Sequence, residues 1–325
     1  MGVAAENRAG GPALVTGGAG FIGSNLVDAL LARGERVIAL DDLSSGRREN
    51  LAGALAAGAE LIEGDVADAG TVATVFDRHR PTVVYHLAAQ IDVRVSVADP
   101  RFDLTVNVGG TLNLLDTIRE RGAQTRIVLA STGGAIYGEG EAQELPFAED
   151  AACRPDAPYG QSKHAAEGYL GVYARLHALS AVALRLGNVY GPRQDPHGEA
   201  GVVAMFTGAM LGGLPYRVYG DGEQTRDYVF VGDVVEAFLA AAASAGGGAL
   251  NVGTGVETSV NDLGELLAHA CGVEFAPDRA PARAGEVQRT ALDPSRAGVE
   301  LGWRATTELG QGLEATVDSI RAAGG

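Results

Sequence analysis

The sequence predicts an α/β protein in which a doubly wound parallel sheet forms the larger body and a smaller C-terminal lobe completes the chain. Three observations lead to this fold class. Short apolar runs alternate with amphipathic stretches over about the first 190 residues, and a glycine-rich segment at residues 16–23 follows the first apolar run directly. After Gly187 the alternation gives way to segments broken by proline and glycine. Alternation of strands and helices implies right-handed crossovers and therefore parallel strands.

The apolar runs are continuous and rich in Val, Ile and Leu, which is typical of strands buried on both faces. The predicted strands are residues 13–16, 36–40, 60–63, 82–87, 126–130 and 181–186. The amphipathic stretches between them predict helices at residues 20–33, 69–80, 100–121 and 159–178. Gly34 and Gly122 follow two of these stretches, where a helix C-cap favours glycine.

The second half of the chain predicts one further helix at 233–243 and one further strand at 249–253, which we expect to return to the sheet. Ser259, with Asp262 three residues later, is typical of a capping box that opens another helix. We therefore predict a larger domain formed by residues 11–187 and about 229–255. The smaller lobe is formed by residues 188–228 and 256–325.

Composition excludes several classes of protein. The 325 residues carry a net charge of −16, and a chain this acidic is a poor partner for nucleic acid or an anionic membrane. Uninterrupted apolar runs are too short to span a bilayer, and the first 11 residues lack the apolar core of a signal peptide. Cys153 and Cys271 are isolated and lack metal-ligand spacing, so we expect reduced thiols, a cytoplasmic chain and no metal site.

The glycine-rich segment predicts a dinucleotide-binding turn. Gly17, Gly20 and Gly23 lie between the first strand and the first helix, where glycines let a pyrophosphate approach the helix N-terminus. Asp41 ends the second strand 18 residues after Gly23, where an acid binds the adenosine ribose and repels a 2′-phosphate. This favours NAD over NADP, although Arg47 and Arg48 nearby leave NADP open. A tight turn without a ligand is the alternative.

Asp65 follows the third strand and is a candidate for contact with the adenine edge. An ordinary loop aspartate at a strand end is an equally good interpretation.

A tyrosine and a lysine four residues apart predict a catalytic pair. Tyr159 and Lys163 share one face of a predicted helix, and an ammonium near a phenol favours the phenolate. Such a pair can take a proton from a substrate hydroxyl while the carbon is oxidised by NAD. Ser131 and Thr132, at the end of the preceding strand, supply a hydroxyl to the same oxygen. Lys163 is also the only lysine of the chain, which otherwise carries 24 arginines. An amphipathic surface helix is the alternative.

Together these segments resemble the extended short-chain dehydrogenases/reductases, and within them the NAD-dependent epimerase/dehydratase family, in particular its UDP-glucose 4-epimerases. The motifs that carry the resemblance are TGGAGFIG at 16–23, DDLSSG at 41–46, HLAA at 86–89, ST…YG at 131–138, YGQSK at 159–163, R…NVYGPR at 185–193, GDG…RDY at 220–228 and RAGE at 283–286.

The resemblance implies a Rossmann-type NAD-binding domain and a sugar-nucleotide-binding lobe. It implies that Tyr159 is the base and that Lys163 is its partner. The hydroxyl position matches less cleanly: counting back from Tyr137 gives Gly133, whereas counting forward along the strand gives Thr132. Glycine has no hydroxyl, so Thr132 is our first choice and Ser131 our second. The implied NAD-binding residues are Gly17, Gly20, Phe21, Ile22, Gly23, Asp41, Asp42, Ser45, Gly46, Asp65, Val66, Leu87, Ala88, Ala89, Gln90, Asn107, Ser131, Tyr159 and Lys163.

On the substrate side, the resemblance implies that arginines and polar groups bind the nucleotide diphosphate and uridine of a UDP-sugar. The implied substrate-binding residues are Asn188, Val202, Tyr219, Arg226, Arg283 and Glu286. Guanidinium groups suit a diphosphate because they donate two parallel hydrogen bonds to it. The implied activity is NAD-dependent 4-epimerisation of UDP-glucose and UDP-galactose through a 4-keto intermediate, in a homodimer.

Several alternatives remain open at this stage. A small residue at Thr290 admits UDP-N-acetylglucosamine as a further substrate. A 4,6-dehydratase needs acid groups just after the Ser/Thr, and Gly133 and Gly134 stand there. A sugar-nucleotide decarboxylase, a dehydrogenase that exchanges free NAD, and a cofactor-binding regulator without activity are further possibilities.

Overall fold

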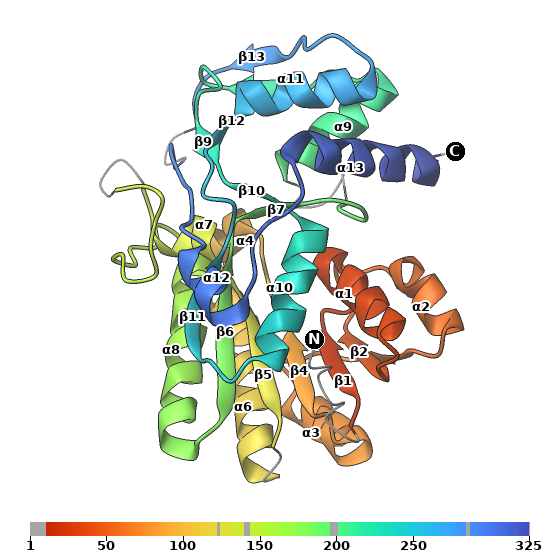
Figure 1. Cartoon of the computed structure of the whole chain (residues 1–325), viewed down its shortest axis with the longest axis vertical. Coiled ribbons are helices and arrows are strands. Elements are labelled where there is room, and N and C mark those ends of the chain that lie inside the picture. The colour runs from red at the N-terminus through yellow and green to blue at the C-terminus, as the bar shows by residue number, and fades with distance from the viewer. Residues whose placement is uncertain (1–10, 122–123, 140–143, 196–200, 284–286, 325) are drawn as a thin grey trace, which may run out of the picture.

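The computed structural model describes residues 11–121, 124–139, 144–195, 201–283 and 287–324. Within these residues, a parallel sheet of seven strands forms the larger body, in the order β11-β6-β5-β4-β1-β2-β3 (Figure 1). Its strands are β1 Ala13–Thr16, β2 Val37–Asp41, β3 Glu60–Glu63, β4 Val83–His86, β5 Arg126–Thr132, β6 Ser180–Leu186 and β11 Gly248–Val252. The predicted α/β class, the parallel strands and the return of the last strand to the sheet are all confirmed.

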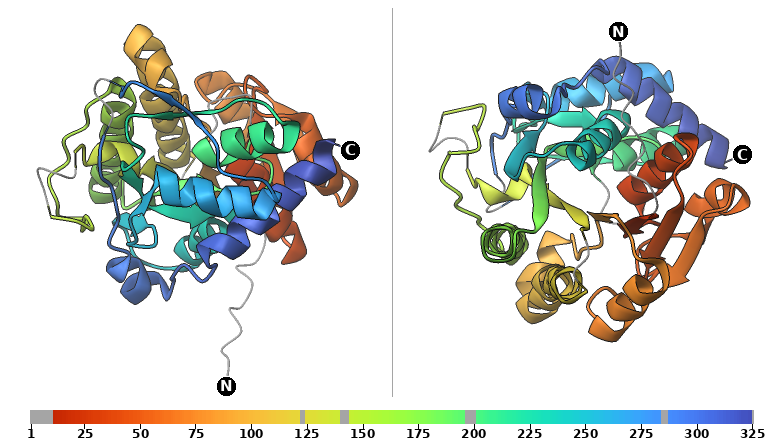
Figure 2. Two further views of the ribbon diagram at one scale, coloured as in Figure 1. Left: turned by 90° about the horizontal axis from the view of Figure 1, so that it is seen from above. Right: turned by 60° about the horizontal axis from the view of Figure 1, so that its bottom comes forward.

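Helices cover both faces of this sheet (Figure 2). The helices are α1 Phe21–Ala32, η1 Arg48–Leu51, α2 Ala52–Ala56, α3 Ala69–His79, α4 Val93–Ala98, α5 Pro100–Leu104, η2 Thr105–Gly109, α6 Gly110–Glu120, α7 Gly133–Ile136, α8 Pro158–His177, α9 Val202–Gly212, α10 Val231–Ala243, α11 Val260–Cys271, α12 Ser295–Leu301 and α13 Leu309–Gly324.

Each face of the sheet has its own apolar core. Along β1, Ala13 and Val15 pack with α1 and α10 on one face, whereas Leu14 packs with α3, α6 and α8 on the other. This alternation follows the two-residue period of a strand, so one apolar run serves both cores. The continuous hydrophobic character of the strands is the consequence of this double burial.

One predicted helix is interrupted. The stretch predicted as a single helix over 100–121 is α5, a π-helical turn η2 and then α6. Asn107 lies in η2, and its side chain forms two hydrogen bonds with the backbone of Gln90, which is 17 residues earlier in the sequence. A contact between distant segments therefore accompanies the irregular turn. Such turns occur often at functional sites. The other predicted helices and strands lie within two residues of their expected ends.

The smaller lobe lies above the sheet in Figure 1 and consists of α9, α11 and α13 with short strand pairs. Those strands are β7 Asn188–Tyr190, β8 Arg217–Tyr219, β9 Thr225–Arg226, β10 Tyr228–Phe230, β12 Thr258–Ser259 and β13 Asp278–Ala280. Phe206, Leu263 and Leu313 are at most 3% exposed and form its core. Ser259 caps α11 as its spacing with Asp262 predicts, because its hydroxyl accepts from the Asp262 amide at 3.0 Å.

The division of the chain into two lobes stays a prediction. From residues 256–325, Ala297 and Trp303 pack into the core under the sheet, and the Trp303 indole donates to the Asp233 carbonyl at 2.8 Å. No helix in the described part of the chain is long and apolar enough to cross a membrane.

Candidate active site

Two of the predicted segments, the glycine turn that begins at Gly17 and residues 87–90, directly follow β1 and β4, where the strand order of the sheet reverses. Open α/β sheets bind their ligands in the crevice outside such a switch point. Gly17 has φ +67°, and a Cβ there would stand 2.7 Å from the Ala88 amide nitrogen. A Cβ on Gly23 would stand 2.0 Å from the Gly17 carbonyl. Only glycine fits these close approaches. The turn therefore carries no side chains at these positions, and α1 begins directly after it with Phe21 and Ile22.

Asp41 ends β2 beside this turn and is 6% exposed. Its carboxylate accepts hydrogen bonds from the backbone amides of Ala19 and Leu43, both at 2.9 Å. Burial raises the pKa of Asp41, and these two hydrogen bonds lower it. A Cβ on Gly46 would stand 2.6 Å from the Asp41 carboxylate, so a side chain at this position would press against that group. This arrangement suits an acid that binds ribose hydroxyls.

The two arginines that left NADP open are paired with acids. Arg47 pairs with Asp195 at 2.5 Å, and Arg48 pairs with Glu63. A guanidinium already engaged with a carboxylate is poorly disposed to bind a 2′-phosphate as well, so the geometry favours NAD.

The polar residues that flank Asp41 and β3 serve local turns. Asp42 accepts from the Ser44 amide and hydroxyl, and Ser45 is exposed. Asp65 is exposed and accepts from the Ala67 amide at 2.7 Å, while Val66 is buried. The turn interpretation of Asp65 therefore has a structural basis, and its contact with adenine stays a prediction.

The loop after β4 is fixed by His86, a residue whose structural role the sequence did not reveal. His86 is 1% exposed, with Nδ1 at 2.8 Å from the Thr16 hydroxyl and Nε2 at 3.1 Å from the Thr111 hydroxyl. Burial, with Lys163 nearby, lowers the pKa of His86 to about 3, so the ring is neutral. Thr16 Oγ1 accepts from the Ala88 amide at 3.2 Å. This chain of contacts positions residues 87–90, including Leu87, Ala89 and Gln90.

Tyr159 and Thr132 come together as predicted. The Thr132 side chain acts to lower the pKa of Tyr159, although burial of the phenol dominates and raises that pKa to about 12. Lys163 is 4% exposed, and its Nζ donates to the Ala130 carbonyl at 2.9 Å. Burial lowers the pKa of Lys163 to about 8. Helix α8 thus presents the tyrosine and the lysine to the end of β5.

Ser131 does not share this arrangement. It is 4% exposed, and its hydroxyl has no hydrogen-bond partner among the described residues. Thr132 ends β5, and the additional residue before Tyr137 is taken up in the short helix α7. A Cβ on Gly133 would stand 2.4 Å from a methyl group of Leu292. Counting back from Tyr137 leads to Gly133, and the Leu292 side chain occupies the space into which a side chain at this position would extend.

The substrate-side residues come from the smaller lobe. The Arg283 guanidinium lies 3.7 Å above the Tyr219 ring, which is a cation–π arrangement. Arg226 is in β9 and donates to the Thr225 carbonyl at 2.8 Å. Asn188 begins β7 close to Gly134, with its Oδ1 3.6 Å from where a Cβ on that glycine would stand. Val202 begins α9. Glu286 lies outside the described residues.

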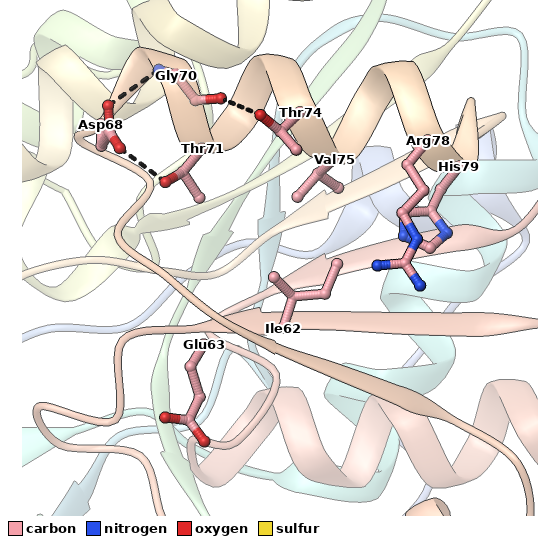
Figure 3. Close-up of a pocket in the computed structure, with 9 residues that line it drawn as sticks. All are labelled: Ile62, Glu63, Asp68, Gly70, Thr71, Thr74, Val75, Arg78 and His79. Atoms are coloured by element: carbon pink, nitrogen blue, oxygen red, sulfur yellow. Dashed lines mark hydrogen bonds between the residues drawn. The ribbon is translucent and has the colours of Figure 1, made fainter.

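A separate hollow of about 380 Å³ lies between β3 and α3 (Figure 3). Ile62 and Glu63 face it from the strand, and Asp68, Thr71 and Thr74 face it from the helix. Asp68 uses its carboxylate to cap α3, at 2.9 Å from the Gly70 amide. None of the predicted site residues lines this hollow, so it is not part of the site.

Comparison with known proteins agrees with this geometry. The model of the NAD dependent epimerase/dehydratase family matches residues 13–253. The chain belongs to this family. NAD is therefore the cofactor, and the glycine turn, the Asp41 carboxylate at the end of β2 and the buried, unpartnered Ser131 hydroxyl fit a bound dinucleotide.

Individual relatives are similar over nearly their whole length. The UDP-glucose 4-epimerase of Mycolicibacterium smegmatis is 48% identical over 95% of this chain and 98% of its own. The crystal structure of the Thermotoga maritima UDP-glucose 4-epimerase with UDP-glucose is 44% identical, with a TM-score of 0.92 over 97% and 100% of the two chains. The Thermus thermophilus enzyme in complex with NAD is 46% identical, with a TM-score of 0.89 over 96% and 99%.

Proposed function

We propose that this protein interconverts UDP-glucose and UDP-galactose by NAD-dependent 4-epimerisation. The observation that carries the proposal is the placement of Tyr159 and Lys163, both on α8, against the end of β5, where Lys163 donates to the Ala130 carbonyl at 2.9 Å and the Thr132 side chain lowers the pKa of the phenol. These groups are suited to removing and returning a proton at one substrate hydroxyl. The similarity to UDP-glucose 4-epimerases at 44% to 48% identity supports the choice of substrate.

The residues of the chain divide the work of the reaction. Bound NAD would supply a reversible hydride acceptor for the sugar C4, and the positive charge of its ring would favour a phenolate. Tyr159 takes the proton of the 4-hydroxyl and later returns it. Thr132 donates to the same oxygens, and Lys163 holds a positive charge close to them. The reaction consumes no external reductant, because the hydride removed from C4 is returned to C4.

Binding of the nucleotide is assigned to the smaller lobe. Asn188, Arg226 and Arg283 bind the diphosphate, Tyr219 lies along the uracil, and Val202, at the start of α9, is a further substrate contact. Glu286 binds the uridine ribose. Gly17, Gly20 and Gly23 hold the pyrophosphate of the dinucleotide against α1, and Asp41 holds its adenosine ribose.

A sugar-nucleotide 4,6-dehydratase fits less well. That reaction needs an acid group just after the catalytic hydroxyl, and Leu292 occupies the space beside Gly133 where such a side chain would stand. UDP-N-acetylglucosamine stays a second candidate substrate, because a small residue, Thr290, stands where a bulky side chain would exclude the N-acetyl group. Thr290 is 2% exposed and lies seven residues after Arg283.

Two apolar helix surfaces support a homodimer. Phe102 and Leu104 on α5 are 50% and 58% exposed, and Tyr169, Val172 and Leu176 on α8 are 43%, 36% and 71% exposed. Exposed apolar patches on neighbouring helices mark protein–protein contacts. Cys153 and Cys271 are free thiols, which supports a reducing cytoplasmic location.

The experiment that tests the proposal incubates the purified protein with UDP-galactose and no added cofactor. Formation of UDP-glucose supports the proposal. Unchanged substrate, or a 4-keto-6-deoxy product, contradicts it.

A further inference from the structure

Asp103 is a buried carboxylate next to the catalytic pair that none of the assigned roles uses. It lies on α5 and is 1% exposed. Its Oδ1 accepts from Gln90 Nε2 at 3.0 Å and from Asn107 Nδ2 at 3.1 Å. Its Oδ2 is buried without a hydrogen-bond partner among the described residues. An incompletely paired buried carboxylate is costly, so its presence calls for a nearby positive charge.

A chain of hydrogen bonds connects Asp103 to the catalytic helix. Asn107, in the π-helical turn η2, also places its Nδ2 3.0 Å from the Ser162 hydroxyl. That hydroxyl donates to the Tyr159 carbonyl at 3.0 Å, and Lys163 is the next residue of α8. Three hydrogen bonds therefore link Asp103 to the backbone that carries both catalytic side chains.

Two carboxylates act on Lys163, those of Asp103 and Glu167, and the oxygens of Asp103 are the less engaged by other partners among the described residues. His86 on β4 is neutral, and Tyr159 is on the same helix as the lysine. Glu167, one turn further along α8, is bound by the Arg185 guanidinium at 2.8 Å.

The groups next to Asp103 are also engaged. Asp92, at the start of α4, uses its carboxylate to cap that helix, at 2.7 Å from the Arg94 amide. Among the groups that oppose the effect of burial on Lys163, Asp103 acts more strongly than Glu167. Its negative charge raises the pKa of Lys163 and also the pKa of Tyr159.

We propose that Asp103 is a positioning residue of the catalytic pair, which anchors α8 through Asn107 and Ser162 and keeps Lys163 in its ammonium form. The kinetic consequence rests on the proposed epimerase function, whereas the charge of Lys163 does not. Because the carboxylate acts on both catalytic groups, its neutralisation shifts both limbs of the pH–activity profile to lower pH. A residue that only supported the fold would lower activity equally at every pH.

Lys163 is the only lysine, so its charge can be followed directly. Protein labelled with [ε-¹³C]lysine gives a single lysine signal in a carbon–proton NMR spectrum, and its shift against pH reports the titration of Lys163 alone. In the Asp103→Asn variant we expect the midpoint to fall by about one pH unit or more, the usual effect of losing one nearby opposite charge. The Asp77→Asn variant changes an exposed carboxylate on α3 that pairs with Arg121, and should leave the midpoint unchanged.

The second arm measures UDP-galactose epimerisation from pH 6 to pH 10. Asp103→Asn should move both limbs down by a similar interval, so that the fraction of its own maximal kcat that it retains at pH 9 is about tenfold smaller than in the wild type. Thermal unfolding and bound-NAD content establish that the variant is folded, and Asp103→Ser replaces it if it is not. An unchanged lysine midpoint, or a uniform loss of activity without a shift of the profile, overturns the proposal. A wild type without epimerase activity refutes the proposed function alone, because the NMR arm still decides the charge of Lys163.

Discussion

Thr132 acts on Tyr159 and lowers the pKa of its phenol, while the hydroxyl of Ser131, one residue earlier, is buried without a partner among the described residues. A lower pKa favours the phenolate of Tyr159. This difference distinguishes two hydroxyls that the sequence alone left as first and second choice.

Thr132→Ala should lower kcat by about 100-fold, because a positioned proton-transfer partner contributes on that scale. Ser131→Ala removes the neighbouring hydroxyl, which is more deeply buried, and should lower kcat clearly less than Thr132→Ala does. Steady-state kinetics with UDP-galactose separate the two. Equal losses for the two variants would show that Thr132 is not the catalytic hydroxyl.

Activity should fall as the pH rises above about 8, because burial lowers the pKa of Lys163 to about 8 and the ammonium is present only below it.

Lys163→Arg should keep the fold and the net charge and lower kcat by about 100-fold or more, since a guanidinium is broader than an ammonium and presents its charge differently. Far-ultraviolet circular dichroism provides the folding control. An active arginine variant with a flat profile above pH 8 would exclude the proposed role of the lysine.

Gly133→Asp should destabilise the protein by about 1 to 3 kcal/mol, because a Cβ there meets Leu292 at 2.4 Å in a packed core. Thermal unfolding measures the loss. The double variant Gly133→Asp with Leu292→Ala opens the space and should recover part of the loss. Equal stability of wild type and Gly133→Asp would mean that Leu292 moves aside freely, and the argument against dehydration would fail.

The protein should sediment as a dimer, and Leu176→Glu on α8 should give monomers in analytical ultracentrifugation. A charge placed on a 71% exposed leucine is harmless to a monomer and costly in an apolar interface. Val299→Glu on α12 is the matched control, since Val299 is 87% exposed and lies on another element. A monomeric wild type, or dissociation by both variants, would contradict the assignment of α5 and α8 as the interface.

The parts of the fold that the sequence predicts correctly depend on local signals. The buried strands, the glycine turn at Gly17–Gly23 and the Ser259 cap each follow from a few neighbouring residues. The break at η2 was not predicted, because it accompanies contacts of Asn107 with Gln90 and Ser162, which are 17 and 55 residues away. The pairs Arg47–Asp195 and Arg48–Glu63 also join residues far apart in sequence, separated by 148 and 15 positions.

The candidate site divides in the same way. Tyr159, Lys163 and Asp41 are predictable because motif spacing places them at strand and helix ends. His86 and Asp103 lie on predicted elements, but their importance depends on burial and on partners from other segments. The HLAA motif and the spacing of Asp103 and Asn107 by one helical turn are the signals that point to them.

The most direct test of the account follows the isomer composition of the sugar nucleotide by proton NMR after UDP-galactose is mixed with freshly purified protein and no added NAD. Parallel arms contain UDP-N-acetylgalactosamine and the Tyr159→Phe variant. We predict UDP-glucose as the product in the wild type, turnover of the N-acetylated sugar through the small Thr290 position, and no product with Tyr159→Phe, which should still contain NAD. Unchanged UDP-galactose with NAD-loaded wild-type protein, or full activity of Tyr159→Phe, would contradict the central claim.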